Sequence, residues 1–125
     1  MADAAENAKP DAAPGTMHVR KENGIGWMIY DQQAKYNAVT FDMRRAIPGI
    51  MADFEADDDV RVAVIAGAGE KAFISGSDIS QFGEKRSSEE ARRMYDEASE
   101  QANLAMRNFP KPMIAMIHGY CLGAG

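Results

Sequence analysis

The stretch that decides the fold is Lys111-Pro-Met-Ile-Ala-Met-Ile-His-Gly-Tyr-Cys-Leu-Gly-Ala-Gly125. Its apolar run, Met113 to Ile117, follows prolines at positions 110 and 112 and precedes three glycines within seven positions. Prolines delimit the start of a strand because they cannot donate to a sheet ladder. Glycines let the backbone turn sharply and approach a ligand closely. The pattern predicts a strand that leads into a loop with exposed backbone N–H groups, of the kind that holds an anion where a helix begins.

The composition is typical of a globular domain. The 125 residues are 46% hydrophobic and 26% charged, as in ordinary soluble proteins. A formal net charge of −5 argues against a general nucleic-acid binder, which needs a basic face. No apolar run approaches the roughly 20 residues of a membrane helix. The single cysteine, Cys121, excludes an intrachain disulfide and suits a reducing compartment, so we expect a cytoplasmic protein.

The first third of the chain predicts a tail, a hairpin and a helix. Residues 1–16 are rich in Ala, Asp, Asn and Pro, and we expect a disordered tail there. Asn23-Gly24 separates two β-rich runs, which favours a hairpin turn. Thr40 is a predicted helix N-cap, and Pro48 predicts a kink or break inside that helix. Asp57 to Asp59 ends the helix and is interpreted as a solvated turn, because no calcium-loop spacing follows it.

The remaining elements complete an α/β pattern. Residues 60–65 predict a buried strand, and residues 71–74 predict a short one. A second helix is expected to begin at Ser87-Ser88, with acidic residues in its first turn. Its apolar stripe, interpreted as core, comprises Met94, Tyr95, Ala98, Ala102, Ala105 and Phe109. The order strand, strand, helix, strand, strand, helix, strand places the chain in the α/β class.

Two small-residue loops, Phe73 to Ile79 and Gly119 to Gly125, each follow a predicted strand. Two backbone N–H groups that converge on one oxygen form an oxyanion hole, and losing one donor costs about 10²–10³ in rate. The alternative is that both loops are plain glycine turns. A nucleophilic Ser77 is not favoured, because its surroundings do not match Gly-x-Ser-x-Gly. His118 is interpreted as structural, and no Cys/His cluster has metal spacing.

Seven short blocks of the sequence are informative in combination. They are Asn37-Ala38, Asp57 to Val64, Gly67-Ala-Gly69, Lys71-Ala-Phe73, Ser75-Gly-Ser-Asp-Ile79, Pro110-Lys-Pro112 and Gly119 to Gly125. In this order the chain, from about Val19 to Gly125, resembles the enoyl-CoA hydratase/isomerase (crotonase) superfamily. The resemblance implies a crotonase-like ββα spiral, of which residues 17–125 would be the N-terminal part. It also implies acyl-CoA substrates, no cofactor beyond the CoA of the substrate, no metal, and a trimer or hexamer of identical chains.

The resemblance also assigns residues. The two oxyanion donors map onto the backbone N–H groups of Ser77 and Ala124, where the family often has Ala and Gly; either change keeps the N–H. The substrate-binding positions that map onto this chain are Lys35, Asn37, Ala38, Ser75, Gly76, Asp78, Ile79, Tyr120, Leu122 and Gly123. The family's acid/base glutamates fall beyond Gly125. We therefore expect a chain truncated within the second oxyanion loop, and inactive when expressed alone.

The function implied is an enoyl-CoA hydratase that adds water to a 2-enoyl-CoA thioester, with a role in fatty acid metabolism. Within the family the alternative is an isomerase or another crotonase activity. A non-catalytic acyl-CoA-binding member is a further alternative. From a different class, Gly119-x-x-x-Gly123-x-Gly125 matches an NAD-dependent short-chain dehydrogenase loop, although that loop normally opens the first βαβ unit.

Overall fold

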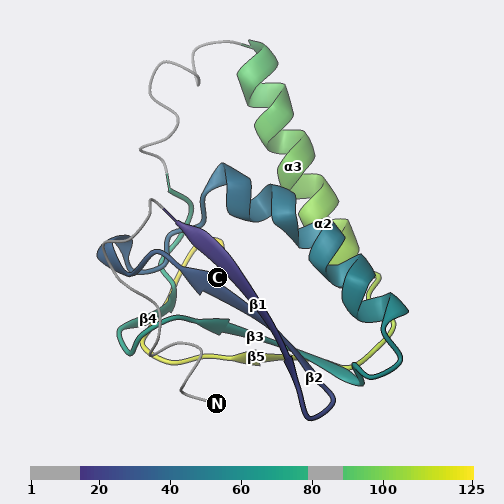
Figure 1. Cartoon of the computed structure of the whole chain (residues 1–125). Helices are drawn as coiled ribbons and strands as arrows, with labels where there is room; N and C mark the ends of the chain where they lie inside the picture. Colours follow the sequence, from purple (N-terminus) through teal and green to yellow (C-terminus); the bar gives the residue numbers. More distant parts are fainter. Residues whose placement is uncertain (1–14, 79–88) are drawn as a thin grey trace.

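The computed structural model of the protein describes residues 15–78 and 89–125 (Figure 1). Its elements, in chain order, are β1 (Thr16–Glu22), β2 (Ile25–Asp31), the 3-10 helix η1 (Gln33–Lys35), α2 (Phe41–Ala56), β3 (Val62–Gly67), β4 (Ala72–Ile74), α3 (Glu89–Arg107), β5 (Met113–Met116) and β6 (Tyr120–Cys121). The predicted order of strands and helices is confirmed, with η1 and β6 as short additions. Most of the predicted tail lies outside the described residues, but Thr16 belongs to β1 and not to the tail.

Two sheets organise these elements. The larger sheet has the order β1-β2-β3-β5, in which β1 is antiparallel to β2 and the other pairs are parallel. The smaller sheet pairs β4 with β6 in parallel. The predicted hairpin is confirmed between β1 and β2, where Asn23 (φ 53°) and Gly24 (φ 82°) both take the left-handed conformation. That conformation is the one Asn-Gly turns supply.

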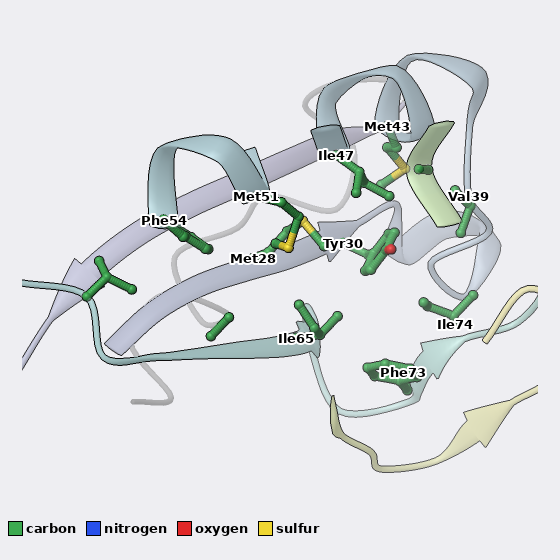
Figure 2. Close-up of a cluster of buried hydrophobic side chains, with 13 residues drawn as sticks. Met28, Tyr30, Val39, Met43, Ile47, Met51, Phe54, Ile65, Phe73 and Ile74 are labelled. Atoms are coloured by element: carbon green, nitrogen blue, oxygen red, sulfur yellow. The ribbon is translucent and has the colours of Figure 1, made fainter. Parts of the chain in front are cut away.

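The central strands are buried on both faces and so create two apolar clusters. In β2, Met28 and Tyr30 point toward the helices, whereas Trp27 and Ile29 point to the opposite side. This alternation follows from the two-residue period of a strand, and burial on both faces is typical of parallel sheets covered by helices. Figure 2 shows the helix-side cluster, in which the β2 side chains face those of α2.

Helix α2 begins and ends as its sequence predicts, but it does not break. The Thr40 hydroxyl accepts a hydrogen bond from the Met43 N–H at 3.1 Å, and Asp57 is the C-cap. Of the kink or break predicted at Pro48, the break does not occur, because the helix continues through this residue from Phe41 to Ala56. Burial of Met43, Ile47, Met51 and Phe54 along one face offsets the cost of about 3 kcal/mol that an interior proline carries.

Helix α3 packs against α2 (Figure 1), but its predicted core stripe is only partly buried. Ala102 is buried, and Ala105 and Phe109 pack against the helix-side cluster. Met94 is 49% exposed, so its assignment to the core is wrong. It lies instead in an open groove with Phe41 and Pro48 of α2. The predicted start at Ser87-Ser88 lies outside the described residues, and the helix is seen from Glu89.

Lys111, which lies just before β5, contacts the end of α2 and the segment that leads into β3. The Lys111 ammonium donates hydrogen bonds to the carbonyl oxygens of Phe54 at 2.6 Å, Asp57 at 2.8 Å and Val60 at 2.7 Å. It thereby fixes the segment before β5 against the end of α2 and the approach to β3. A cation at this position also interacts favourably with the C-terminal end of the helix dipole.

We expect Lys111→Met to destabilise the protein by about 2 kcal/mol, because it removes charge-assisted hydrogen bonds and leaves carbonyls without a donor. The free energy of unfolding, measured by urea denaturation, checks this. Lys71→Met is the matched control, since Lys71 is exposed and the same substitution there should change stability by less than about 0.5 kcal/mol. Equal effects of the two substitutions would contradict the role of Lys111.

Candidate functional site

The first two predicted ligand-lining segments lie against each other. The Ser75 hydroxyl donates to the Lys35 carbonyl oxygen at 3.0 Å. The Lys35 ammonium lies 3.4 Å from an oxygen of the buried Asp78 carboxylate. A parallel bridge pairs Val39 with Ser77. The loop after η1 and the loop after β4 therefore form one surface.

The third predicted segment, around β6, joins the same surface. The Leu122 N–H donates to the Ile74 carbonyl oxygen at 2.9 Å, which places the second glycine loop beside the first. A Cβ added to Gly123 would lie 3.4 Å from the Gly76 Cα, so the two loops approach each other closely at these glycines. The turn into β6 requires glycine, because Gly119 has φ +63° and a Cβ there would lie 2.0 Å from a backbone oxygen of the β4 segment.

The two predicted oxyanion donors carry N–H groups that the described part of the fold does not use. In the bridge, the Val39 N–H donates to the Gly76 oxygen at 2.8 Å, and the Val39 oxygen accepts from the Asp78 N–H at 2.9 Å. Ser77, between these two partners, therefore directs its own N–H away from Val39. Within residues 15–78 and 89–125, neither the Ser77 N–H nor the Ala124 N–H donates a hydrogen bond. Both remain available to a ligand.

A cavity of about 220 Å³ opens beside Ala124 and Gly125. Residues of the large sheet, of β4, of α2 and of α3 line it. Its lining consists of Tyr30, Val39, Arg44, Ile47, Ile65, Phe73, Ile74, Ala102, Asn103, Met106, Met113, Ala115, Ala124 and Gly125. Figure 2 shows several of these side chains in the space between α2 and β4. The cavity is thus apolar apart from an asparagine, a tyrosine and one cation.

The Ser77 hydroxyl accepts two hydrogen bonds from neighbouring side chains. The Arg44 guanidinium donates to it through Nη2 at 2.6 Å, and the Tyr95 hydroxyl donates at 3.2 Å. The same guanidinium lies 5.5 Å from the centre of the Tyr95 ring. A nucleophilic serine needs a neighbouring base that accepts its proton, and both neighbours here donate instead. The arrangement favours a role for the Ser77 backbone over one for its hydroxyl.

Asn37 is buried and its side chain is fully engaged inside the protein. Its Oδ1 accepts from the Gln32 N–H at 2.9 Å, and its Nδ2 donates to the carbonyl oxygens of Ala68 and Ala72 at 2.9 and 2.8 Å. Its φ of 60° is one that asparagine tolerates better than most residues. The Asn37 side chain therefore fixes the loop, and any ligand contact at this position falls to the backbone.

The other predicted substrate-binding residues divide into buried and exposed ones. Ala38 and Asp78 are buried, and both accept hydrogen bonds from the Gln32 amide nitrogen, at 2.7 and 3.1 Å. Tyr120 and Leu122 are each 57% exposed, and the Tyr120 ring meets that of Tyr36 edge-on at 5.6 Å. The two exposed residues add apolar surface beside the glycine loops. Ile79 lies outside the described residues.

The two histidines have local partners. His118 Nε2 lies 2.9 Å from the Gly69 carbonyl oxygen, which agrees with its structural interpretation. His18 Nε2 lies 2.7 Å from an Asp31 carboxylate oxygen. Among the described residues, no group of three His, Cys, Asp or Glu side chains could hold a metal ion. The described helices, α2 and α3, are not apolar enough over a sufficient length to cross a membrane.

Sequence reasoning missed two residues that shape the site. Gln32 gave no signal, because a polar residue in a polar loop is expected to face solvent. Arg44 did give one: it falls three residues before Ile47 and seven before Met51, on the apolar face of α2. A cation within an apolar stripe marks a position where the helix faces something other than core.

Tyr30, which lines this cavity, has a phenol with a raised pKa. Burial raises the pKa of the Tyr30 phenol to about 12, and the nearby Arg44 charge opposes that rise. Because the folded state holds this proton more tightly, Tyr30 contributes stability that is complete below pH 10 and is lost as the pH rises toward 12. We expect one tyrosine to ionise late in a titration followed by absorbance, and Tyr30→Phe to abolish that late component. A late component that persists in Tyr30→Phe would assign it to another tyrosine.

Comparison with known proteins shows which family the chain matches. The family described as Enoyl-CoA hydratase/isomerase matches residues 25–125. The hydroxycinnamoyl-CoA hydratase-lyase of Pseudomonas fluorescens is 33% identical over 116 residues, which cover 88% of this chain and 41% of that protein. The mitochondrial 3-hydroxyisobutyryl-CoA hydrolase of Bos taurus is 36% identical over 118 residues, covering 92% and 30%.

The fold is similar to that of solved members of the family. A crystal structure of an enoyl-CoA hydratase/isomerase family protein from Hyphomonas neptunium superposes with a TM-score of 0.79 at 31% identity, over 89% of this chain and 42% of that one. The predicted crotonase-like fold is thereby confirmed. The chain spans about two fifths or less of the length of these relatives.

Proposed function

Because the chain belongs to the enoyl-CoA hydratase/isomerase family, we propose that the complete natural polypeptide is a crotonase-type enzyme that binds an acyl-CoA thioester. Its proposed reaction is the addition of water to a 2-enoyl-CoA. The two relatives described above are named for reactions of CoA thioesters, one as a hydratase-lyase and the other as a hydrolase. The family therefore supports the substrate class more strongly than the reaction.

The observation that supports this function best is the pair of unused N–H groups at Ser77 and Ala124. They lie on two neighbouring loops, and Ala124 helps to line the apolar cavity. A thioester oxygen placed between them would receive two hydrogen bonds, and its acyl chain would enter the cavity. Donors that are fixed before the substrate arrives stabilise developing charge without reorganisation.

The proposed chemistry uses these donors in the transition state. The oxygen of water bonds to C3 of the enoyl chain, and the C2–C3 π electrons move toward the thioester oxygen. The resulting enolate is held by the Ser77 and Ala124 N–H groups. It then takes a proton at C2, while the attacking water loses one, so that one water molecule is added overall. Hydrogen bonds that strengthen as the oxygen gains charge lower the barrier.

No aspartate or glutamate is among the described residues that line the cavity, so these residues supply no carboxylate for proton transfer. The resemblance to the family assigns this role to glutamates outside the chain, so we propose that another part of the complete polypeptide supplies them. The same site with a different acid/base arrangement would move a double bond instead. A delta(3,5)-delta(2,4)-dienoyl-CoA isomerase of Arabidopsis thaliana, 30% identical over 115 residues, supports isomerisation as the second candidate.

The two candidates are separated by substrate choice. A hydratase given a 2-enoyl-CoA forms the 3-hydroxyacyl-CoA, with loss of the enoyl absorbance. An isomerase given a 3-enoyl-CoA forms the 2-enoyl-CoA and adds no water. Product identification by mass spectrometry after each incubation distinguishes them. Calorimetric titration should give binding heat with acetyl-CoA and none with NAD, and the opposite result would contradict a thioester site.

We expect Ser77→Pro to lower turnover by about 10²–10³, because proline removes one oxyanion donor. Ser77→Ala keeps the N–H and should have a much smaller effect, although it removes the acceptor shared by Arg44 and Tyr95. Steady-state kinetics of the complete polypeptide with a 2-enoyl-CoA measure both. Unchanged affinity for free CoA shows that each variant is folded. A Ser77→Pro protein that binds CoA and retains wild-type turnover would exclude this donor.

We further propose that the complete polypeptide assembles as a trimer or hexamer and acts in the cytoplasm. Support for the assembly comes from the family resemblance, and support for the compartment comes from the single cysteine. Sedimentation at several protein concentrations measures the assembly.

A further inference from the structure

Arg44 is the one charged residue among the described residues that line the cavity beside Ala124. It extends from α2 into a space otherwise formed mainly by aliphatic and aromatic side chains. Charged groups are rare in such surroundings because their transfer from water is unfavourable unless a partner compensates them. The Arg44 guanidinium is therefore expected to have a partner that compensates its charge.

The partners of Arg44 in the described structure do not compensate its charge. Nη2 donates to the Ser77 hydroxyl, and the guanidinium lies over the Tyr95 ring, but both groups are neutral. No carboxylate among the described residues forms an ion pair with Arg44. The Arg44 Nε is buried and has no hydrogen-bond acceptor there. A buried donor without an acceptor is unusual in native proteins and is unfavourable.

A purely structural role does not account for this arrangement. The Tyr95 hydroxyl already donates to the Ser77 hydroxyl at 3.2 Å, so a neutral group suffices to orient that side chain. Arg45, the next residue, shows the ordinary alternative for an arginine on this helix. It is exposed, and its guanidinium lies 5.6 Å from the centre of the Phe41 ring.

We propose that Arg44 is a specificity residue that binds a carboxylate carried by the acyl group of the substrate. This inference rests on the proposed acyl-CoA function and adds the class of acyl chain to it. An acyl group that enters past Ala124 meets apolar walls along its length and the Arg44 cation within them. A carboxylate is the ligand that a guanidinium binds most favourably, through charge-assisted hydrogen bonds. It would compensate the charge and accept from donors that the fold leaves unpaired.

The size of the cavity restricts the acyl chain further. At about 220 Å³ it is smaller than the roughly 300–1,000 Å³ of pockets for drug-sized ligands. A short chain with a terminal carboxylate fits both the volume and the charge. A fatty acyl chain that ends in a methyl group has no charge for Arg44 to bind.

The test compares two saturated acyl-CoA thioesters of matched length, one ending in a carboxylate and one in a methyl group. Neither can be hydrated, so calorimetric titration of the complete natural polypeptide measures binding alone. Wild-type protein should bind the carboxylate thioester at least about 10-fold more tightly. Arg44→Met should reduce that preference by about 10–100-fold, the factor expected for a lost charge-assisted pair, and Arg44→Lys should restore part of it. Arg45→Met on the same helix is the control and should leave the preference unchanged.

The outcomes separate this inference from the function on which it rests. If neither thioester binds to wild-type protein, the acyl-CoA function fails and the inference fails with it. If both bind with equal affinity, or if Arg44→Met weakens both equally, acyl-CoA binding stands and carboxylate recognition is overturned. Should Arg44→Met not fold, the preference of the wild-type protein alone decides. The ratio of kcat/KM for the corresponding pair of 2-enoyl thioesters should change in parallel with the affinities.

Discussion

The structure depends on the way one buried asparagine satisfies the backbone around it. Asn37 accepts from the N–H of Gln32 and donates to the carbonyl oxygens of Ala68 and Ala72. These groups lie at three places in the chain: directly after β2, directly after β3 and at the first residue of β4. Each would cost about 1–3 kcal/mol if buried without a partner. No aliphatic residue could form hydrogen bonds to all three places, so the loop that carries part of the candidate site is held in position by this side chain.

Rigid connections let the site be assembled from backbone atoms. The hydrogen bonds of the Asn37 side chain fix the loop that leads to Val39. Val39 in turn binds the Gly76 carbonyl oxygen and the Asp78 N–H, which lie on either side of Ser77. The Ser77 N–H is directed outward as a consequence of that pairing. Pairing of β4 with β6 then brings the loop with Ala124 alongside. Backbone donors fixed in this way tolerate changes of side chain, which explains how Ser and Ala can stand at these two positions.

The sequence predicted the elements of the fold well because their signals are local. The Asn23-Gly24 turn, the Thr40 cap and the two glycine loops each depend on a few adjacent residues. The errors arose where distant contacts decide. A break at Pro48 did not occur, because the free energy gained by burying one face of α2 exceeds the cost of a proline inside a helix. The internal role of the Asn37 side chain could not be predicted either, since its partners at Ala68 and Ala72 lie more than 30 residues away in sequence.

The distribution of unpaired polar groups separates the structural parts of the protein from the candidate site. Asn37, Gln32 and Lys111 each bind two or more polar partners inside the protein. In the candidate site, by contrast, the Ser77 N–H, the Ala124 N–H and the Arg44 Nε have no acceptor among the described residues. All three are donors, and one belongs to a cation. A ligand that brings negative charge would meet these donors with little dielectric screening if the space around them is apolar. The three donors therefore support the proposed binding of such a ligand.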